Sequence, residues 1–313
     1  MTSRDDPTRR LTDRPTIRLI AFSRAPALVA ALHAGFFARE GLDVVYTKAT
    51  ASGPQLDGLL AGRHDIAHTA ADNVVARVDA GADLRIVLVA ELGVEHRLVG
   101  GPGVRTLAGV AGGVLAVDAP DSGHAVLGYA LLAEAGVARE AYAVLPVGAT
   151  RMRLDAIRDG RAAAAMLNVP YDALAVAAGC HVLADAAQRF PGHPGLTVAV
   201  RGAWGTAHRT AVEGYCRAVV AGARWAADPA NTDALVDLVA EDEGVDRAEA
   251  SARVAREKRA NVPSLGRMAE AVRSVALLRT SVGLRPADPD DSGVDTARYF
   301  DPSYALAADP TLG

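Results

Sequence analysis

Short apolar runs alternate with segments of helical periodicity along the first part of the chain. The run at 17–23 is rich in apolar and β-branched residues and predicts a strand, and apolar positions at helical spacing from Pro26 predict a helix that Gly41 ends. The strand predicted at 84–92 is nearly all apolar, which is typical of a parallel sheet covered on both faces. The same criteria predict helices at 54–61 and 74–79 and strands at 42–50, 65–69 and 84–92.

The alternation resumes after residue 110 and gives way to long helices near Trp204. From Trp204 onward, long helical periods carry acidic and basic faces, as helices packed on a larger body do. The pattern therefore predicts an α/β chain with C-terminal helices. Before Trp204 it predicts strands at 114–120, 141–148 and 162–170 and helices at 122–136 and 151–160.

Length and charge narrow the fold and the partners. At 313 residues, the chain has room for about two compact lobes with a cleft between them. Its 50% hydrophobic and 22% charged residues are globular proportions. A net charge of −4 argues against nucleic acid as a partner, because a duplex binder needs a basic face. No run approaches the about 18 to 20 apolar residues of a membrane span, so none is expected.

The cysteines, histidines and N-terminal residues exclude several other classes. Cys180 and Cys216 are too few for a disulfide framework or a cysteine-based metal site. His64 and His68 would stand about 13 Å apart on a strand, too far to share an ion, so we expect no metal and no other cofactor. Residues 1–16 are polar and lack the apolar segment of a secretory signal. As written, the chain is expected to be cytoplasmic, or periplasmic if a presequence is missing.

Six segments, taken in order, resemble a known family. The most specific pair is a helix running into Gly-Phe-Phe-Ala-Arg-Glu-Gly-Leu-Asp-Val, followed by a leucine-rich helix that ends in Gly-Arg-His-Asp-Ile-Ala. The order is similar to that of the NMT1/THI5-like (SsuA-like) substrate-binding protein family, which has the type II periplasmic-binding-protein fold. The resemblance extends from about residue 17 to residue 306. The segments are 30–44, 53–67, 76–90, 106–123, 145–185 and 218–231.

This resemblance implies a two-lobed α/β fold with a central cleft and C-terminal helices. The cleft would close by hinge motion of the lobes. Crossovers between the lobes are expected near 92–99 and 196–201. The expected divisions are a disordered tail at 1–16, lobe I at 17–95, lobe II at 96–198, a return to lobe I with the C-terminal helices at 199–306, and a tail at 307–313.

Polar residues at strand ends are the candidate site residues, because ligands sit outside the carboxyl ends of strands in open α/β sheets. Ser23 and Arg24 follow the first strand, where a guanidinium can hold a carboxylate or sulfonate; otherwise Arg24 is a solvated loop residue. Ser52 and Gly53 precede a helix whose first backbone N–H groups attract anions, unless Ser52 only caps that helix.

A further group of polar residues follows the third strand. His68 is either a hydrogen-bonding group of the pocket or a satisfied interior histidine. The four residues of this group are His68, Thr69, Asp72 and Asn73.

Lobe II supplies the facing candidates. The resemblance implies ligand contacts at the turn formed by Ser122, Gly123 and His124. Asn168 and Tyr171 end another strand and offer an amide and a phenol to the cleft, unless they serve only the turn.

Two functions from different classes follow. We favour binding of a small organic anion or heterocycle by the substrate-binding component of an ABC importer, with a permease as partner, as the resemblance implies. The alternative is a cytosolic enzyme on the same fold, of decarboxylase, desulfinase, lyase or hydrolase type, with His68, His124, Asp72 and Arg24 as acid, base or anion clamp. The family's iron-dependent pyrimidine synthesis is not expected, because the resemblance places Thr69 and Asn73 where that reaction needs a Lys-xxx-His pair.

Overall fold

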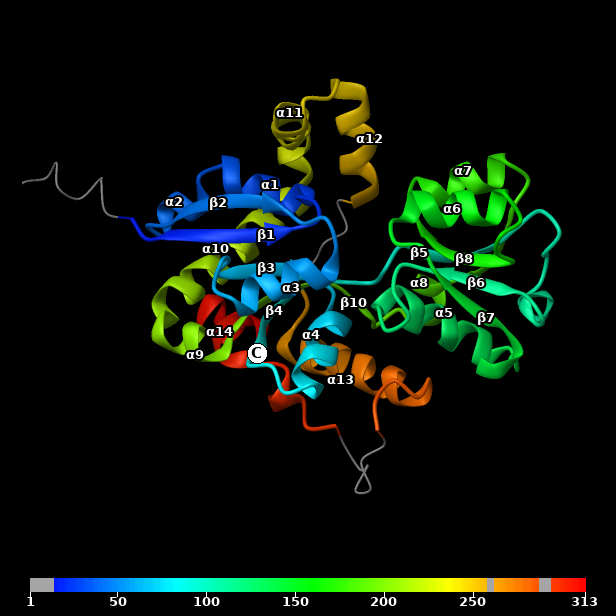
Figure 1. The fold of residues 1–313 in the computed structure, drawn as a ribbon. Helices are drawn as coiled ribbons and strands as arrows, with labels where there is room; N and C mark the ends of the chain where they lie inside the picture. Colours follow the sequence, from blue (N-terminus) through cyan, green and yellow to red (C-terminus); the bar gives the residue numbers. More distant parts are fainter. Residues whose placement is uncertain (1–13, 258–261, 287–293) are drawn as a thin grey trace, which may run out of the picture.

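The computed structural model describes residues 14–257, 262–286 and 294–313 and shows two lobes, each built on its own sheet (Figure 1). The tail expected at 1–16 lies outside the described residues up to residue 13, and Thr16 already begins the first strand. Among the described helices, none combines the length and the apolar character that a membrane crossing requires.

The sheet of lobe I has five strands in the order β2-β1-β3-β10-β4. β1 pairs in parallel with both β2 and β3, whereas β10 runs antiparallel between β3 and β4. Its strands are β1 (Thr16–Ala21), β2 (Asp43–Lys48), β3 (Ile66–Thr69), β4 (Leu84–Leu92) and β10 (Pro194–Arg201).

Helices from both ends of the chain cover this sheet. The single helix expected from Pro26 to Gly41 is instead two helices, because Gly35 adopts a left-handed conformation (φ 78°) between them. The close packing of α1 on α10 depends on Gly222, where an added Cβ would lie 2.7 Å from the Ala27 carbonyl oxygen. The helices are α1 (Pro26–His33), α2 (Phe36–Arg39), α3 (Ser52–Leu60), α4 (Ala71–Asp79), α9 (Gly202–Ala207), α10 (Arg209–Ala227), α13 (Leu265–Ser281) and α14 (Pro302–Ala308).

Lobe II repeats the architecture with the strand order β7-β6-β8-β5-β9. β6 pairs in parallel with β7 and β8, and β5 runs antiparallel to β8 and β9. Strands β5 and β9 were not predicted from the sequence. The elements are β5 (His96–Gly100), β6 (Val114–Val117), β7 (Ala143–Pro146), β8 (Ala164–Asn168), β9 (His181–Asp185), α5 (Gly123–Glu134), α6 (Thr150–Arg158), α7 (Tyr171–Ala177) and α8 (Ala186–Arg189).

Two adjacent crossovers connect the lobes. The first lies between β4 and β5, and the second precedes β10, where the Gly93 N–H donates to the His193 carbonyl at 2.7 Å and ties the two together. The stretch 196–201, expected to be the return crossover, is β10 itself and lies inside the lobe I sheet. The apolar run does not connect the lobes, because its backbone hydrogen-bonds to β3 on one side and to β4 on the other.

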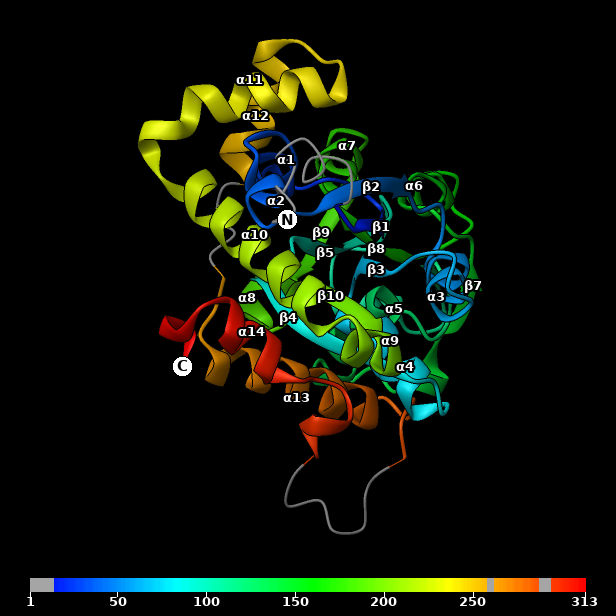
Figure 2. The same cartoon turned by 90° about the vertical axis from the view of Figure 1, so that its left-hand side faces the viewer.

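A helical hairpin and a C-terminal segment complete lobe I (Figure 2). The hairpin consists of α11 (Thr232–Glu243) and α12 (Arg247–Glu257), and α11 packs on α1. The expected tail at 307–313 is ordered: α14 continues to Ala308, and Leu312 is buried against the lobe I core. Short 3₁₀ turns occur at Leu107–Val110, Arg139–Ala141, Pro229–Asn231, Thr296–Arg298 and Pro310–Leu312.

Candidate functional site

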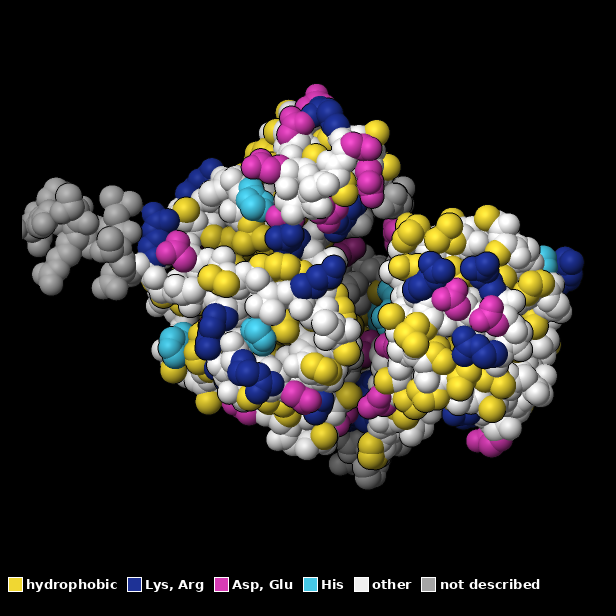
Figure 3. Space-filling model, turned by 45° about the horizontal axis from the view of Figure 1, so that its top comes forward, with side chains coloured by type: hydrophobic (Ala, Val, Ile, Leu, Met, Phe, Trp, Pro, Cys, Tyr) yellow, Lys and Arg dark blue, Asp and Glu magenta, His cyan; other side chains and the backbone are white. Residues whose placement is uncertain are grey.

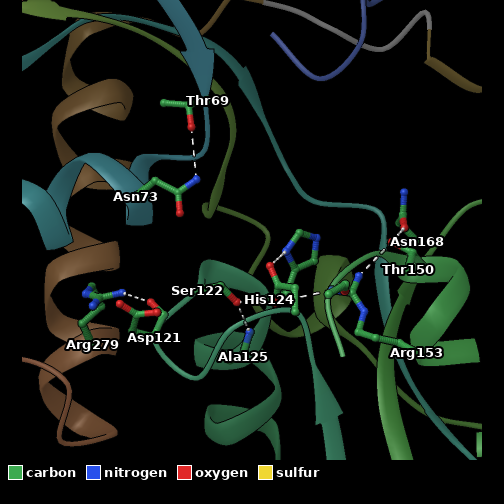
Figure 4. Close-up of polar contacts among 12 residues, drawn as sticks. Thr69, Asn73, Asp121, Ser122, His124, Ala125, Thr150, Arg153, Asn168 and Arg279 are labelled. Atoms are coloured by element: carbon green, nitrogen blue, oxygen red, sulfur yellow. Dashed lines mark hydrogen bonds and ion pairs between the residues drawn. The ribbon is translucent and has the colours of Figure 1, made fainter. Parts of the chain in front are cut away.

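A groove separates the two lobes, with histidine and acidic side chains along it (Figure 3). On each side, helices begin where parallel strands end: α4 after β3 in lobe I, and α5 after β6 in lobe II. The two sides touch at the base of the groove, where an added Cβ on Gly123 would lie 3.0 Å from the Asp72 side chain and Arg279 of α13 donates to the Asp121 carbonyl at 2.9 Å. The strand-end residues of both lobes therefore face one another across this groove, which we call the cleft (Figure 4).

The lobe II wall of the cleft is organised around Asp118, the residue that follows β6. Ser122 caps α5, since its hydroxyl accepts from the Ala125 N–H at 3.2 Å and donates to the Asp118 carboxylate. His124 lies beside the same carboxylate, with Nδ1 3.4 Å from Oδ2. Burial alone would raise the pKa of Asp118, but hydrogen bonds from His124 and Ser122 and the positive charges of His124 and Arg153 hold it well below its usual range.

Arg153 extends this wall toward β8. Its side chain is only 2% exposed; Nη1 lies 3.4 Å from Asp118 Oδ1, and Nη2 donates to Thr150 Oγ1 at 2.8 Å. The Thr150 hydroxyl in turn donates to Asn168 Oδ1 at 2.8 Å. Nearby, the His96 and His124 rings are 4.4 Å apart, and burial lowers the pKa of His96 well below its ordinary value.

The sequence predicted part of this wall. Ser122, His124 and Asn168 were proposed as site residues, and the structure brings them together on one side of the cleft. Asp118 and Thr150 were missed, although both stand where a strand ends or a helix begins and the same criterion would have found them. Arg153, one helical turn beyond Thr150, and His96, on a strand that was not predicted, carried no such signal. Tyr171 is half-buried and packs on the apolar cluster beneath α6 and α7.

The lobe I wall carries Thr69 and Asn73. Thr69 is buried at the end of β3, where its hydroxyl accepts from Asn73 Nδ2 at 3.1 Å and its carbonyl accepts from the Thr197 hydroxyl at 2.7 Å. Asn73 is half-buried, and its Oδ1 has no hydrogen-bond partner among the described residues. This amide oxygen is therefore free to meet a ligand.

The start of α3 differs from the expectation for Ser52. Ala51 occupies the capping position and offers no side-chain hydrogen bond, so Ser52 is the first residue of the helix rather than its cap. An added Cβ on Gly53 would meet nothing within 4 Å, so the helix start borders open space. The first N–H groups of α3 are consequently available to a bound molecule.

Two proposed catalytic residues are already engaged within the protein. Asp72 is 1% exposed, and its Oδ2 lies 3.2 Å from Nε2 of the buried His193. Arg24 contacts Asp242 of α11, Nε to Oδ2 at 2.9 Å, and stacks on the Tyr46 ring. An anion clamp at Arg24 is therefore not supported, since its guanidinium binds the hairpin instead. Ser23, beside it, is exposed.

His68 belongs to the interior of lobe I. The side chain is 1% exposed, and Nε2 hydrogen-bonds to the Tyr215 hydroxyl at 2.8 Å. Burial lowers the pKa of His68 to about 4. A role for His68 as an acid or base in the cleft is therefore not supported, because its side chain is enclosed in lobe I and bonded to Tyr215. Within the described part of the chain, no three His, Cys, Asp or Glu side chains form a potential metal site.

Comparisons with known proteins find the same two-lobed architecture. The sequence profile of the NMT1-like family matches residues 15–240, whereas no curated protein sequence matches significantly. One similar solved structure is the periplasmic nitrate-binding protein NrtA from Synechocystis PCC 6803, with a TM-score of 0.78 and 16% identity over 96% of this chain and 89% of that one.

Two further structures are similar. The alkanesulfonate-binding protein SsuA from Xanthomonas axonopodis pv. citri, bound to MOPS, has a TM-score of 0.71 and 18% identity over 88% of this chain and 96% of that one. The zinc-bound ligand-binding component of an ABC-type import system from Staphylococcus aureus has a TM-score of 0.74 and 13% identity over 94% and 99%. These likenesses confirm the expected type II periplasmic-binding-protein fold.

Proposed function

This chain belongs to the NMT1-like family, and we propose that it binds a small organic anion or heterocycle in the cleft between its lobes. The observation that carries the proposal is that polar groups on both walls have no hydrogen-bond partner among the described residues, Asn73 Oδ1 in lobe I and Asn168 Nδ2 in lobe II. A site of this kind orients a ligand with a few polar groups while the surrounding lobes remove it from water.

The charges around the cleft fit both ligand classes. Helices α3, α4, α5 and α6 begin at strand ends, and helix starts favour anions. Asp118 adds a negative charge, which the guanidinium of Arg153 beside it offsets. An anionic group near the helix starts and a neutral heterocycle near Asp118 are therefore both accommodated.

The partner follows from the family resemblance. A protein that buries a small molecule between two lobes suits delivery to an ABC permease, so we propose a permease as partner and a periplasmic location for this role. The similarity to nitrate-binding, alkanesulfonate-binding and ABC-type import components supports this proposal.

We expect a ligand of the correct class to raise the melting temperature. A compound at about ten times its Kd stabilises the folded protein by about 1.4 kcal/mol, because it binds the folded state alone. A thermal-shift screen with nitrate, MOPS, benzoate and pyrimidines tests this. Absence of stabilisation by every compound up to millimolar concentration would contradict binding in the cleft.

Replacing His124 by alanine should weaken that binding by up to about ten-fold, since one hydrogen bond contributes about 0.5 to 1.5 kcal/mol. His208→Ala is the matched control, because His208 is exposed and stacks on Trp204 away from the cleft. Mass spectrometry of the bound compound checks the chemistry. Conversion by the wild type that His124→Ala abolishes would favour an enzyme over a binding protein.

A further inference from the structure

We infer that Asn168 presents an amide N–H donor to the cleft and that Arg153 fixes this orientation through Thr150, so that the ligand carries a hydrogen-bond acceptor at this point. The inference rests on the proposed binding function and names the chemistry that one part of the site recognises. Asn168 is then a specificity-determining residue, and Arg153 and Thr150 are positioning residues.

The direction of the hydrogen bonds follows from what each group can do. A guanidinium can only donate, so the 2.8 Å contact from Arg153 Nη2 makes Thr150 Oγ1 an acceptor. The Thr150 hydroxyl keeps its one hydrogen to donate, and Asn168, 2.8 Å away, offers the side-chain acceptor for it among the described residues. If the hydroxyl accepted from the Asn168 NH₂ group as well, that hydrogen would be left without a partner. The Asn168 atom at that position accepts and is therefore Oδ1. The NH₂ group lies on the opposite side of the amide, directed away from Thr150 (Figure 4).

The arginine is held firmly enough to impose this direction. Its side chain is almost completely buried between the Asp118 carboxylate and the Gly148 carbonyl, each 3.4 Å from Nη1. A buried cation of this kind keeps its partners, because an unpaired charge is costly away from water. The relay from Arg153 through Thr150 to Asn168 therefore has one polarity.

Lobe I provides the contrast. There Asn73 donates to the Thr69 hydroxyl at 3.1 Å, but no arginine donates to that hydroxyl in the described structure. A hydroxyl can both donate and accept, so the Asn73 amide can turn over at small cost. The two walls thus differ: Asn73 adapts to a donor or an acceptor, whereas Asn168 requires an acceptor.

The ligand atom that meets Asn168 is therefore an oxygen of a carboxylate or sulfonate, a carbonyl oxygen or an unprotonated ring nitrogen. A group that carries only donors, such as an amidinium, is rejected because its N–H groups would face those of Asn168. Unpaired polar groups buried against each other lose their bonds to water without replacement.

Benzoate and benzamidine are suitable probes, because they share a planar shape and differ in carrying only acceptors or only donors. Their Kd values are measured by ¹⁵N NMR titration of the full chain, following the side-chain amide signals, with the Asn168 signal assigned by its loss in Asn168→Asp. We expect the wild type to prefer benzoate. Asn168→Asp should shift the ratio of the two Kd values toward benzamidine by roughly 100-fold, because it replaces the donor by a charged acceptor.

Thr150→Val should shift the ratio in the same direction by about three- to ten-fold, since the amide is then free to turn, and Thr150→Ser should restore the wild-type ratio. Asn73→Asp and Thr69→Val are the matched changes on the other wall. Circular dichroism verifies folding, and if Asn168→Asp does not fold, the comparison of valine with serine at position 150 still decides.

The outcomes separate this inference from the proposed function. Probe binding that perturbs Asn73 and His124 signals, combined with a Kd ratio that is unchanged in Asn168→Asp and Thr150→Val, would overturn the inference and leave binding in the cleft intact. A wild-type preference for benzamidine would overturn it too. If neither probe, nor any compound of the thermal-shift screen, perturbs a cleft residue, the binding proposal fails, and the inference with it.

Discussion

Lowering the pH from 7.5 to 5 is expected to destabilise the protein by about 2 kcal/mol through His68 alone. Burial holds the pKa of His68 at about 4 in the folded state, whereas an exposed histidine has a pKa of about 6.5. Below pH 6.5 the unfolded chain therefore binds a proton that the folded protein does not. Stability falls as the pH drops from about 6.5 and levels off near pH 4, where the folded protein also takes up the proton.

Urea unfolding of the wild type and of His68→Gln at both pH values measures this term. Glutamine accepts a hydrogen bond from the Tyr215 hydroxyl but does not titrate, so its variant should lose less stability on acidification. The difference between the two proteins removes the contribution of His96, whose pKa is also lowered by burial and which is common to both. Equal pH dependence in the two proteins would show that His68 is not buried as a neutral side chain.

Much of the fold could be predicted from the sequence, because the apolar runs and the helical spacing of apolar residues mark the faces that are buried. The strand predicted at 84–92 coincides with β4, and the one predicted at 114–120 begins where β6 begins and extends three residues beyond it, since each strand is a run of mostly buried apolar residues. Strand β10 was not recognised, because an antiparallel strand that crosses back into the first sheet is defined by its pairing with β3 and β4 rather than by its own pattern. Tertiary pairing decides such segments.

The sequence predicted the site residues that lie at strand ends, but not those whose position depends on a partner far away in the chain. Asn168 and His124 follow that rule. Arg24 was misjudged because its partner Asp242 lies 218 residues away on the α11 hairpin. Arg153 was missed for a similar reason. Its position on α6 predicts a polar, exposed side chain, but in the structure it is buried and contacts the Asp118 carboxylate at the end of β6.

His68 shows a further limit of sequence reasoning. Every residue of β3 is buried, so the strand has no polar face that alternation would reveal. Thr69 at its end meets Asn73 at the cleft, whereas His68, one position earlier, points to Tyr215 and the interior. A shift of one residue along a strand reverses the face of the sheet that a side chain occupies, and the sequence alone did not show which of the two residues faces the cleft.

Gly195→Ala is expected to have the other large effect, because Gly195, at the start of β10, packs against the first crossover between the lobes. An added Cβ at Gly195 would lie 2.4 Å from the Gly93 carbonyl oxygen, a backbone atom of the crossover between β4 and β5. The crossovers are also joined by the hydrogen bond from the Gly93 N–H to the His193 carbonyl. Neither strand can yield by a side-chain rotation, so the backbones must separate, and overpacking of this kind costs about 1 to 3 kcal/mol.

The same displacement changes the relative position of the two walls of the cleft, because the crossovers set the distance and orientation between Asn73 and Asn168. Gly195→Ala should therefore lower the urea midpoint and also weaken ligand binding beyond the loss of stability. Gly192→Ala is the matched control, since Gly192 lies in the crossover just before β10 and its added Cβ would meet nothing within 4 Å; it should leave both quantities near the wild-type values. Loss of stability in Gly195→Ala with unchanged affinity would show that the close approach of the crossovers supports folding without setting the geometry of the cleft.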